Sequence, residues 1–202
     1  MTDGVIKYSI EHQTADTPLF SGYKQLEALR TRLFTLGLIG EKDGIGYGNL
    51  SMRNEGSKSF FITATQTGKK QVLSREYYTN ISDYNFNTFK VISQGAHKPS
   101  SEALSHAMIY AIDDRIKTVI HIHSLALWKF MKAKNYLFTT AEYGTAEMVE
   151  EIVGLYNNLD PLLNNTFVMR GHEEGIITFG RSVEEAELVL YTIMQAYLQE
   201  EF

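Results

Sequence analysis

The chain has 202 residues, of which 44% are hydrophobic, and a net charge of −5 at pH 7. This is enough apolar material for one substantial core but not for two, so we expect a single domain. Lysine and arginine are scattered, which argues against nucleic acid as a partner. With no cysteine, disulfides and sulfur-ligated metals are excluded, and a metal site would need His, Asp or Glu.

The N-terminus lacks the apolar stretch of a signal peptide. No later run approaches the roughly 20 apolar residues needed to cross a bilayer. We therefore expect a cytoplasmic protein without membrane contact. Residues 1–20 are interpreted as a loose N-terminal extension and residues 21–202 as the folded domain.

The first predicted elements are a helix and a hairpin. Leucines recur every three or four residues after Ser21, which predicts a helix from Gly22 to Gly40, capped by Ser21 and ended by Gly40. Residues 45–53 and 59–65 are β-like and are separated by a polar turn. We expect them to form an antiparallel hairpin.

The second half of the chain alternates between helical and extended patterns. Pro99 and Ser100 are predicted to open a helix, and Ser182 another whose capping box is completed by Glu185. Because the order is not a regular β-α-β-α repeat, we expect a three-layer α/β/α domain around a mostly antiparallel central sheet. Between those two helices the predicted elements are a strand at 118–124, a helix through Trp128, a helix at 145–159, and strands at 166–171 and 175–180.

Two histidines stand two residues apart on the predicted strand 118–124. The period of two sends the side chains of His121 and His123 to one face, and those of Ile120 and Ile122 to the other. This spacing suits two ligands of one metal ion. A hydrogen-bonded pair of histidines at a strand end fits the same spacing equally well.

A third histidine follows an apolar strand. His172 lies in a turn between two glycines, where side chains can enter a cleft, although a lone histidine in a turn is more often solvated. We interpret the neighbouring Glu173 and Glu174 as solvated charges.

Glu102 and His106 lie four residues apart on the helix predicted after Pro99. A carboxylate in the first turn is favoured by the helix dipole, and this alone would explain Glu102. Beside a metal ion it could instead be a ligand or take a proton from a carbon acid. We interpret His106 as a core or supporting histidine.

Three short segments could present amides and hydroxyls to an anion: residues 48–51, residues 65–68, and Ser100 with Ser101 at a helix N-terminus. Turns of this composition usually only reverse the chain. Each segment alone is therefore weak evidence of an anion site.

In this order, GNLS at 48–51, ITATQTG at 62–68, KPSSE at 98–102, HIHS at 121–124 and GHEEGIITFG at 171–180 resemble the class II aldolase/adducin family. The resemblance runs from the first helix to the C-terminus. It implies a class II aldolase-like fold over residues 21–202 and a homo-oligomer, a fourfold tetramer with active sites at subunit boundaries.

The resemblance also implies a site. Zinc or another divalent ion would be held by His121, His123 and His172, with Glu102 as a further ligand and as the base. The reaction would be cleavage or formation of a C–C bond in a small sugar phosphate through a zinc-stabilised enediolate. The residues that match the family's phosphate pocket are Gly48, Asn49, Thr67, Gly68, Ser100 and Ser101.

The chain departs from the family in two places. The ITATQTG turn is one residue longer than usual, and Thr140 stands where the aldolases carry a tyrosine. In the aldolases, the resemblance implies that this tyrosine gives a proton to the aldehyde oxygen. Tyr143 and the C-terminal Tyr197 are the alternative proton donors in this chain. At the position that matches Glu102, the epimerase of this family carries aspartate, so glutamate here favours an aldolase. The alternatives are an epimerase, dehydratase or decarboxylase of the same family, and a non-catalytic adducin-like interaction domain.

Overall fold

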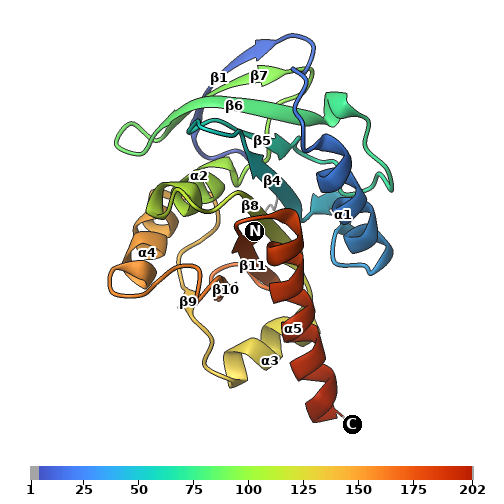
Figure 1. Ribbon diagram of the computed structural model, residues 1–202, viewed down its shortest axis with the longest axis vertical. Coiled ribbons are helices and arrows are strands. Elements are labelled where there is room, and N and C mark those ends of the chain that lie inside the picture. The colour runs from blue at the N-terminus through green and yellow to red at the C-terminus, as the bar shows by residue number, and fades with distance from the viewer. Residues whose placement is uncertain (1–4, 202) are drawn as a thin grey trace.

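The computed structural model describes residues 5–201, which form a twisted central sheet with helices on both faces (Figure 1). In spatial order, the strands of this sheet are β1 (Ser9–Thr14), β7 (Lys90–Gly95), β6 (Tyr78–Asn85), β5 (Phe60–Thr63), β4 (Asn49–Arg53), β8 (Thr118–His123), β11 (Gly175–Gly180), β10 (Thr166–Met169) and β9 (Phe138–Thr139). The edge pairs β1–β7 and β10–β9 are parallel, and every other neighbouring pair is antiparallel.

Helices cover the sheet from two sides and create two apolar cores. One core joins the sheet to α2 and α4, and the other joins it to α1, α3 and α5. The predicted three-layer α/β/α fold is therefore confirmed, with parallel pairs only at the sheet edges. The helices are α1 (Tyr23–Thr35), α2 (Ala103–Ile112), α3 (Leu125–Ala133), α4 (Ala146–Tyr156) and α5 (Val183–Glu201), with a 3₁₀ turn at Arg75–Tyr77.

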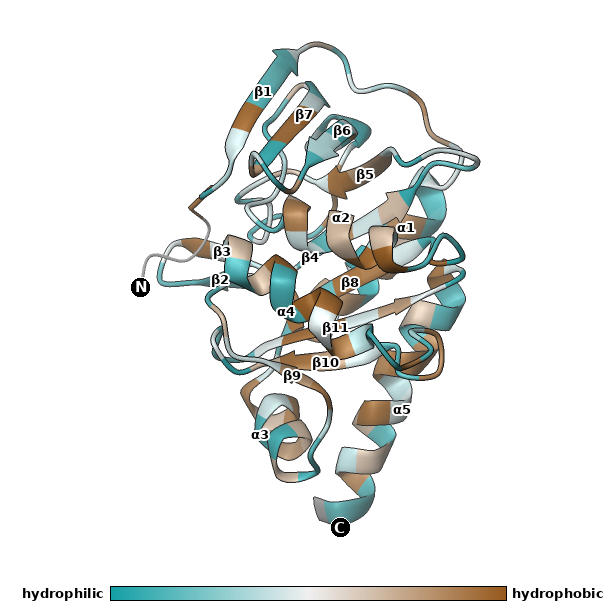
Figure 2. Ribbon diagram, turned by 90° about the vertical axis from the view of Figure 1, so that its left-hand side faces the viewer, coloured by the Kyte–Doolittle hydropathy of each residue, from teal (hydrophilic) through white to brown (hydrophobic). Residues whose placement is uncertain are grey.

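The strand β8 lies in the middle of the molecule and positions the site. Its apolar residues give the brown stretch beneath the helices in Figure 2. Ile120 and Ile122 pack into the core of α1, α3 and α5, as the period of two predicts. His121 and His123 consequently point away from that core. Strand β8 pairs with β4 on one side and with β11 on the other.

The predicted boundaries of the first helix are wrong. Gly22 is the N-cap residue, and no side chain accepts a hydrogen bond from the first turn. Ser21 therefore does not cap this helix. The helix ends earlier, because Gly37 takes φ +71° and the amides of Gly37 and Leu38 bond back to Phe34 and Leu33, a glycine C-cap. Gly40 instead begins β2 (Gly40–Lys42).

The predicted hairpin is only partly correct. Strands β4 and β5 pair antiparallel, but Ile45–Tyr47 forms a separate strand, β3, that pairs with β2 in a two-stranded sheet. The break lies at Gly48, whose φ of +77° turns the chain between β3 and β4. The turn thus brings the small sheet over the end of β4.

Strands β1, β6 and β7 were not predicted. A register shift between Ile81 and Asp83 interrupts the alternation of β6. Strand β1 has a single apolar residue, Ile10, and adds to an edge of the sheet in register with β7. Part of the segment interpreted as an N-terminal extension therefore belongs to the sheet. Among residues 5–201, no helix combines the length and apolarity of a membrane span.

Three glycine backbones meet where the small sheet touches the loop after β5. A Cβ atom on Gly68 would lie 1.9 Å from the carbonyl oxygen of Gly40 and 2.8 Å from the Cα of Gly46. We expect Gly68→Ala to lower the free energy of unfolding by about 1–3 kcal/mol, because the loop must move away. The measurement is urea unfolding.

The matched control is Gly154→Ala in α4, where an added Cβ meets nothing within 4 Å. This variant should gain about 0.5–1 kcal/mol from helix propensity. If Gly68→Ala were as stable as Gly154→Ala, the close approach of the three glycines would be contradicted.

Candidate metal centre

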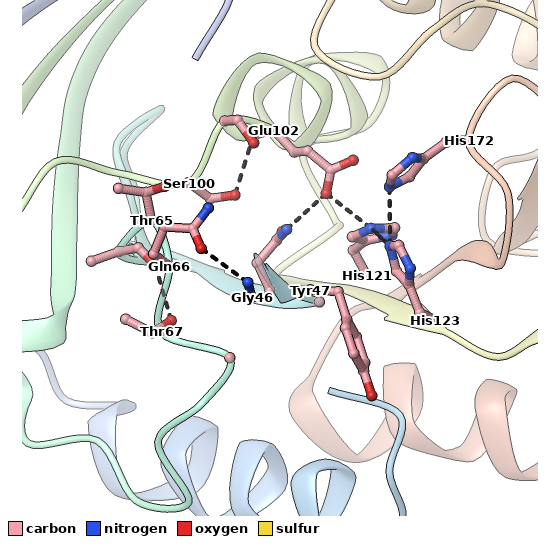
Figure 3. Close-up of a pocket in the computed structure, with 15 residues that line it drawn as sticks. Gly46, Tyr47, Thr65, Gln66, Thr67, Ser100, Glu102, His121, His123 and His172 are labelled. Atoms are coloured by element: carbon pink, nitrogen blue, oxygen red, sulfur yellow. Dashed lines mark hydrogen bonds and ion pairs between the residues drawn. The ribbon is translucent and has the colours of Figure 1, made fainter. Parts of the chain in front are cut away.

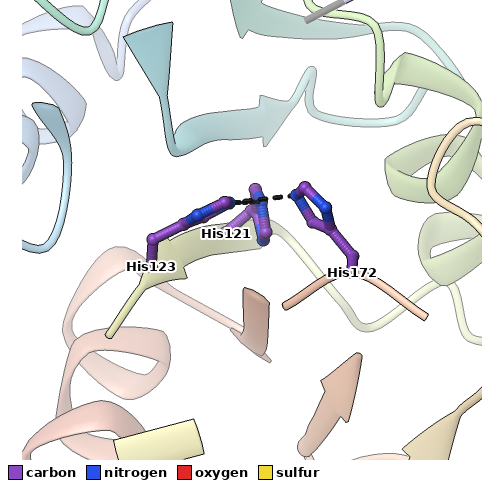
Figure 4. A group of neighbouring side chains, drawn as sticks. All are labelled: His121, His123 and His172. Carbon is purple, nitrogen blue, oxygen red and sulfur yellow. Dashed lines mark hydrogen bonds between the residues drawn. The ribbon is translucent and has the colours of Figure 1, made fainter. Parts of the chain in front are cut away.

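Three imidazoles converge above the centre of the sheet (Figure 4). His121 and His123 come from β8, and His172 from the turn between β10 and β11. The Nε2 atom of His123 lies 3.1 Å from that of His121 and 3.0 Å from that of His172. Gly175 leaves room for this arrangement, since a Cβ there would lie 2.8 Å from His172 Cδ2 and 3.2 Å from His121 Cε1.

The protonation of these rings suits a metal ion. The carbonyl of Ile176 can only accept, so His121 Nδ1, 3.2 Å away, is the donor and Nε2 keeps its lone pair. Burial and the neighbouring imidazoles lower the pKa of both His121 and His123 well below the ordinary value. Nitrogens that share one zinc ion at 2.0–2.1 Å must lie within about 4 Å of one another. The residues present therefore fit a divalent ion.

Glu102 completes this centre from the opposite side (Figure 3). Its Oε2 atom lies 3.1 Å from His121 Nε2 and accepts a 2.7 Å hydrogen bond from Asn49 Nδ2. Glu102 is the N-cap of α2 rather than a first-turn residue. A carboxylate and an imidazole lone pair that face each other at this distance favour a shared cation.

The residues predicted to bind phosphate lie in the same pocket. Loops from three parts of the chain form its wall next to the metal centre, and the N-terminus of α2 faces it. Ser101 is buried just before α2 and lines this pocket. The pocket is lined by Gly48, Asn49, Thr67, Gly68, Ser100 and Ser101, together with Gly46, Tyr47, Ala64, Thr65, Gln66, Glu102 and the three histidines.

Asn49 lines the pocket and also contacts Glu102. It lies opposite His121 in the β4–β8 register, and its amide nitrogen donates one hydrogen bond to Glu102. Its buried Oδ1 has no hydrogen-bond partner in the described chain. Since Oδ1 can only accept, the side chain orients Glu102 and offers a place for a hydroxyl donor.

Two residues beside the histidines were not identified from the sequence. Tyr47 stacks on His123, with ring centroids 5.2 Å apart (Figure 3). Glu174 Oε2 lies 4.0 Å from His123 Nδ1, and its other oxygen lies 3.0 Å from Lys42 Nζ. The interpretation of Glu174 as a solvated charge is therefore wrong. The GHEEG spacing could have indicated its proximity to His172.

The candidate proton donors lie in different surroundings. Thr140 is exposed and bonds to Glu151. Tyr143 is 2% exposed, and its ring lies 4.7 Å from that of His172. Tyr197 packs against Phe130 on α3. Within one chain, Tyr143 is thus the tyrosine of this group that reaches the metal centre.

His106 lies below the site in the core. Its Nδ1 atom is 2.7 Å from the hydroxyl of Ser51, which also contacts Tyr110. Burial, and secondarily the neighbouring His121, lower the pKa of His106 to about 3. A neutral buried ring behind the ligands agrees with its interpretation as a core residue.

Comparison with known proteins identifies relatives of the chain. Residues 41–198 match the family model described as the Class II Aldolase and Adducin N-terminal domain. The chain is 28% identical over 151 residues to the L-fuculose phosphate aldolase of Methanococcus maripaludis, covering 69% of this chain and 76% of the relative.

Two solved structures are similar in fold. An L-fuculose 1-phosphate aldolase matches with a TM-score of 0.64 and 19% identity, covering 92% of this chain and 89% of that one. YgbL of Klebsiella pneumoniae, for which aldolase, epimerase and decarboxylase activities are all named as candidates, matches with a TM-score of 0.65 and 18% identity over 87% and 86% of the chains.

Proposed function

The chain belongs to the class II aldolase and adducin family, and from this premise we propose that it is a metal-dependent aldolase of a small sugar phosphate. The observation that carries the proposal is that three histidines, Glu102 and a pocket lined by backbone amides and hydroxyl side chains lie together. A non-catalytic interaction domain would have no need for this combination.

In this proposal the histidines hold a divalent ion such as zinc. When bound, the ion supplies Lewis acidity to the carbonyl group of the substrate. His121 keeps its Nε2 lone pair available because Nδ1 is committed to Ile176. Glu174 lies 4.0 Å from His123 Nδ1, beyond hydrogen-bond distance, so its proposed part is that of a nearby negative charge.

Glu102 is the proposed base. Its Oε2 atom takes the proton from the carbon next to the carbonyl and returns it in the reverse direction. Asn49 fixes this oxygen through its 2.7 Å hydrogen bond. A carboxylate that is 3% exposed is also shielded from competing protons of bulk water.

The proposed phosphate position lies between the N-terminus of α2 and the loop of residues 65–68. A helix N-terminus attracts negative charge through its free amides and its dipole. The hydroxyl of Ser101 adds a donor at this end. The substrate would then extend from this anion site towards the histidines, with its reacting carbons next to Glu102.

The test is product analysis of the zinc-loaded protein with a panel of ketose phosphates. We expect an aldehyde and a ketone phosphate, with the reverse reaction measurable from the same pair. A rearranged sugar phosphate of unchanged carbon number would instead identify an epimerase, and release of CO₂ from a sugar acid a decarboxylase. A preparation with bound zinc and no turnover across the panel would contradict the aldolase proposal.

A further inference from the structure

Helix α1 carries two buried charges that do not belong to the metal centre. Arg30 is 1% exposed and Glu27 is 8% exposed. The same helix already packs on the sheet through Leu26, Leu29 and Leu33, all fully buried. Burying a guanidinium costs desolvation energy, so its presence requires specific partners.

The partners lie in the loop after β5. Arg30 donates to the carbonyl oxygens of Thr67 at 3.0 Å and Gln71 at 2.9 Å. Glu27 accepts from the amide of Leu73 at 2.7 Å. Two residues of one helix thus fix both ends of the segment 67–73, and this segment begins with the predicted phosphate residues.

The carbonyl of Thr67, which accepts from Arg30 and also from the amide of Lys70 at 3.1 Å, sets the direction of one amide in the pocket. In a trans peptide the carbonyl and the following N–H point in opposite directions, and the described chain has no cis peptide. Since the carbonyl of Thr67 points to Arg30, the N–H of Gly68 points away from it. Gly68 lines the pocket, and no acceptor among residues 5–201 takes this N–H.

We propose that Arg30 is a positioning residue for anion binding: from outside the pocket it orients and polarises the Thr67–Gly68 peptide, so that the Gly68 amide binds a substrate phosphate. The inference rests on the proposed function for the identity of the anion. A charged donor on the carbonyl strengthens the N–H of the same peptide as a donor. Glu27 supports this by holding the far end of the loop and by its charge next to Arg30.

The test compares Arg30→Lys with Arg32→Lys in the zinc-loaded full chain. Arg32 is the matched control because it lies on the same helix and forms a bidentate salt bridge to Glu187. Unlike Arg30, its side chain is 48% exposed. Lysine keeps the charge at either position and loses the planar two-donor geometry. The probe is inorganic phosphate, measured by titration calorimetry.

We expect Arg30→Lys to weaken phosphate binding by about 10- to 100-fold, the effect of losing one charge-assisted hydrogen bond. Its zinc content should stay at the wild-type level, and the amides of residues 66–73 should exchange hydrogen faster. Arg32→Lys should leave the phosphate affinity, the zinc content and the rate of amide hydrogen exchange unchanged. Equal phosphate affinity in the two variants, or parallel loss of zinc and phosphate in Arg30→Lys, would overturn the inference.

If Arg30→Lys does not fold, Glu27→Ala tests the same loop while keeping Arg30, because it removes the acceptor for the amide of Leu73. Weaker phosphate binding at wild-type zinc content would support the inference, and unchanged binding would overturn it. Failure of the proposed function gives a different signature, because the wild-type protein itself would then bind no phosphate and turn over no sugar phosphate. In that case the anion role of Arg30 is overturned together with it.

Discussion

Replacing His121 or His172 with alanine is expected to remove the metal ion and the turnover together. The three Nε2 atoms form one cluster with neighbouring distances of 3.0 and 3.1 Å, so loss of one leaves two imidazoles to hold the ion. Wild-type protein should contain about one divalent ion per chain, the stoichiometry of a single three-histidine site. The measurement is elemental analysis of purified protein alongside an aldol cleavage assay.

The matched control is His97→Ala. His97 is exposed and stacks on Tyr77, away from the pocket, so its variant should keep both metal and activity. The strongest contradiction would come from the double variant of His121 and His172. Full metal occupancy in that protein would show that the ion is held elsewhere, and the assignment of the centre would be abandoned.

Glu102→Gln is expected to separate metal binding from catalysis. Three histidines remain to hold the ion, and the amide of glutamine can still accept the hydrogen bond from Asn49. The side chain can no longer take a proton, so turnover should fall by about 10²- to 10⁴-fold. Exchange of solvent deuterium into the ketone phosphate, catalysed by the wild type, should be lost as well.

Glu173→Gln provides the control for this variant. Glu173 is exposed and adjoins His172 in the chain, so it reports any general effect of removing a negative charge near the site. We expect its turnover to be within about twofold of wild type, as surface changes alter stability and activity little. Unimpaired deuterium exchange in Glu102→Gln would assign the base to another group.

The periodicity of the local sequence was enough to predict how the side chains of β8 are oriented. The period of two placed His121 and His123 on one face of β8, because strand geometry depends little on tertiary context. Helices α3 and α4 begin after Ser124 and Thr145, whose side chains cap them. The sequence resemblance brought in Glu102 and His172, which no periodicity could join to β8. The native metal, the tetramer and the cytoplasmic location stay predictions.

Other features depend on contacts distant in sequence and left no local signal. The separation of β3 from β4 follows from the backbone at Gly48, and the bulge in β6 concealed its alternation. Arg30 looks like a solvated residue of an amphipathic helix, since its partners lie 37 and 41 positions away. Tyr47 reaches His123 only after β2 and β3 fold over β4.

The position of the candidate centre on β8 has a consequence for metal binding. The side chains of the candidate centre lie on β4, β8, the start of α2 and the turn before β11, and pairing of β4, β8 and β11 aligns them. A growing or partly folded chain lacks this alignment until β11, near the C-terminus, has joined. If the proposed site holds an ion, we therefore expect high-affinity binding to require the joined sheet, so that metal affinity reports on its assembly.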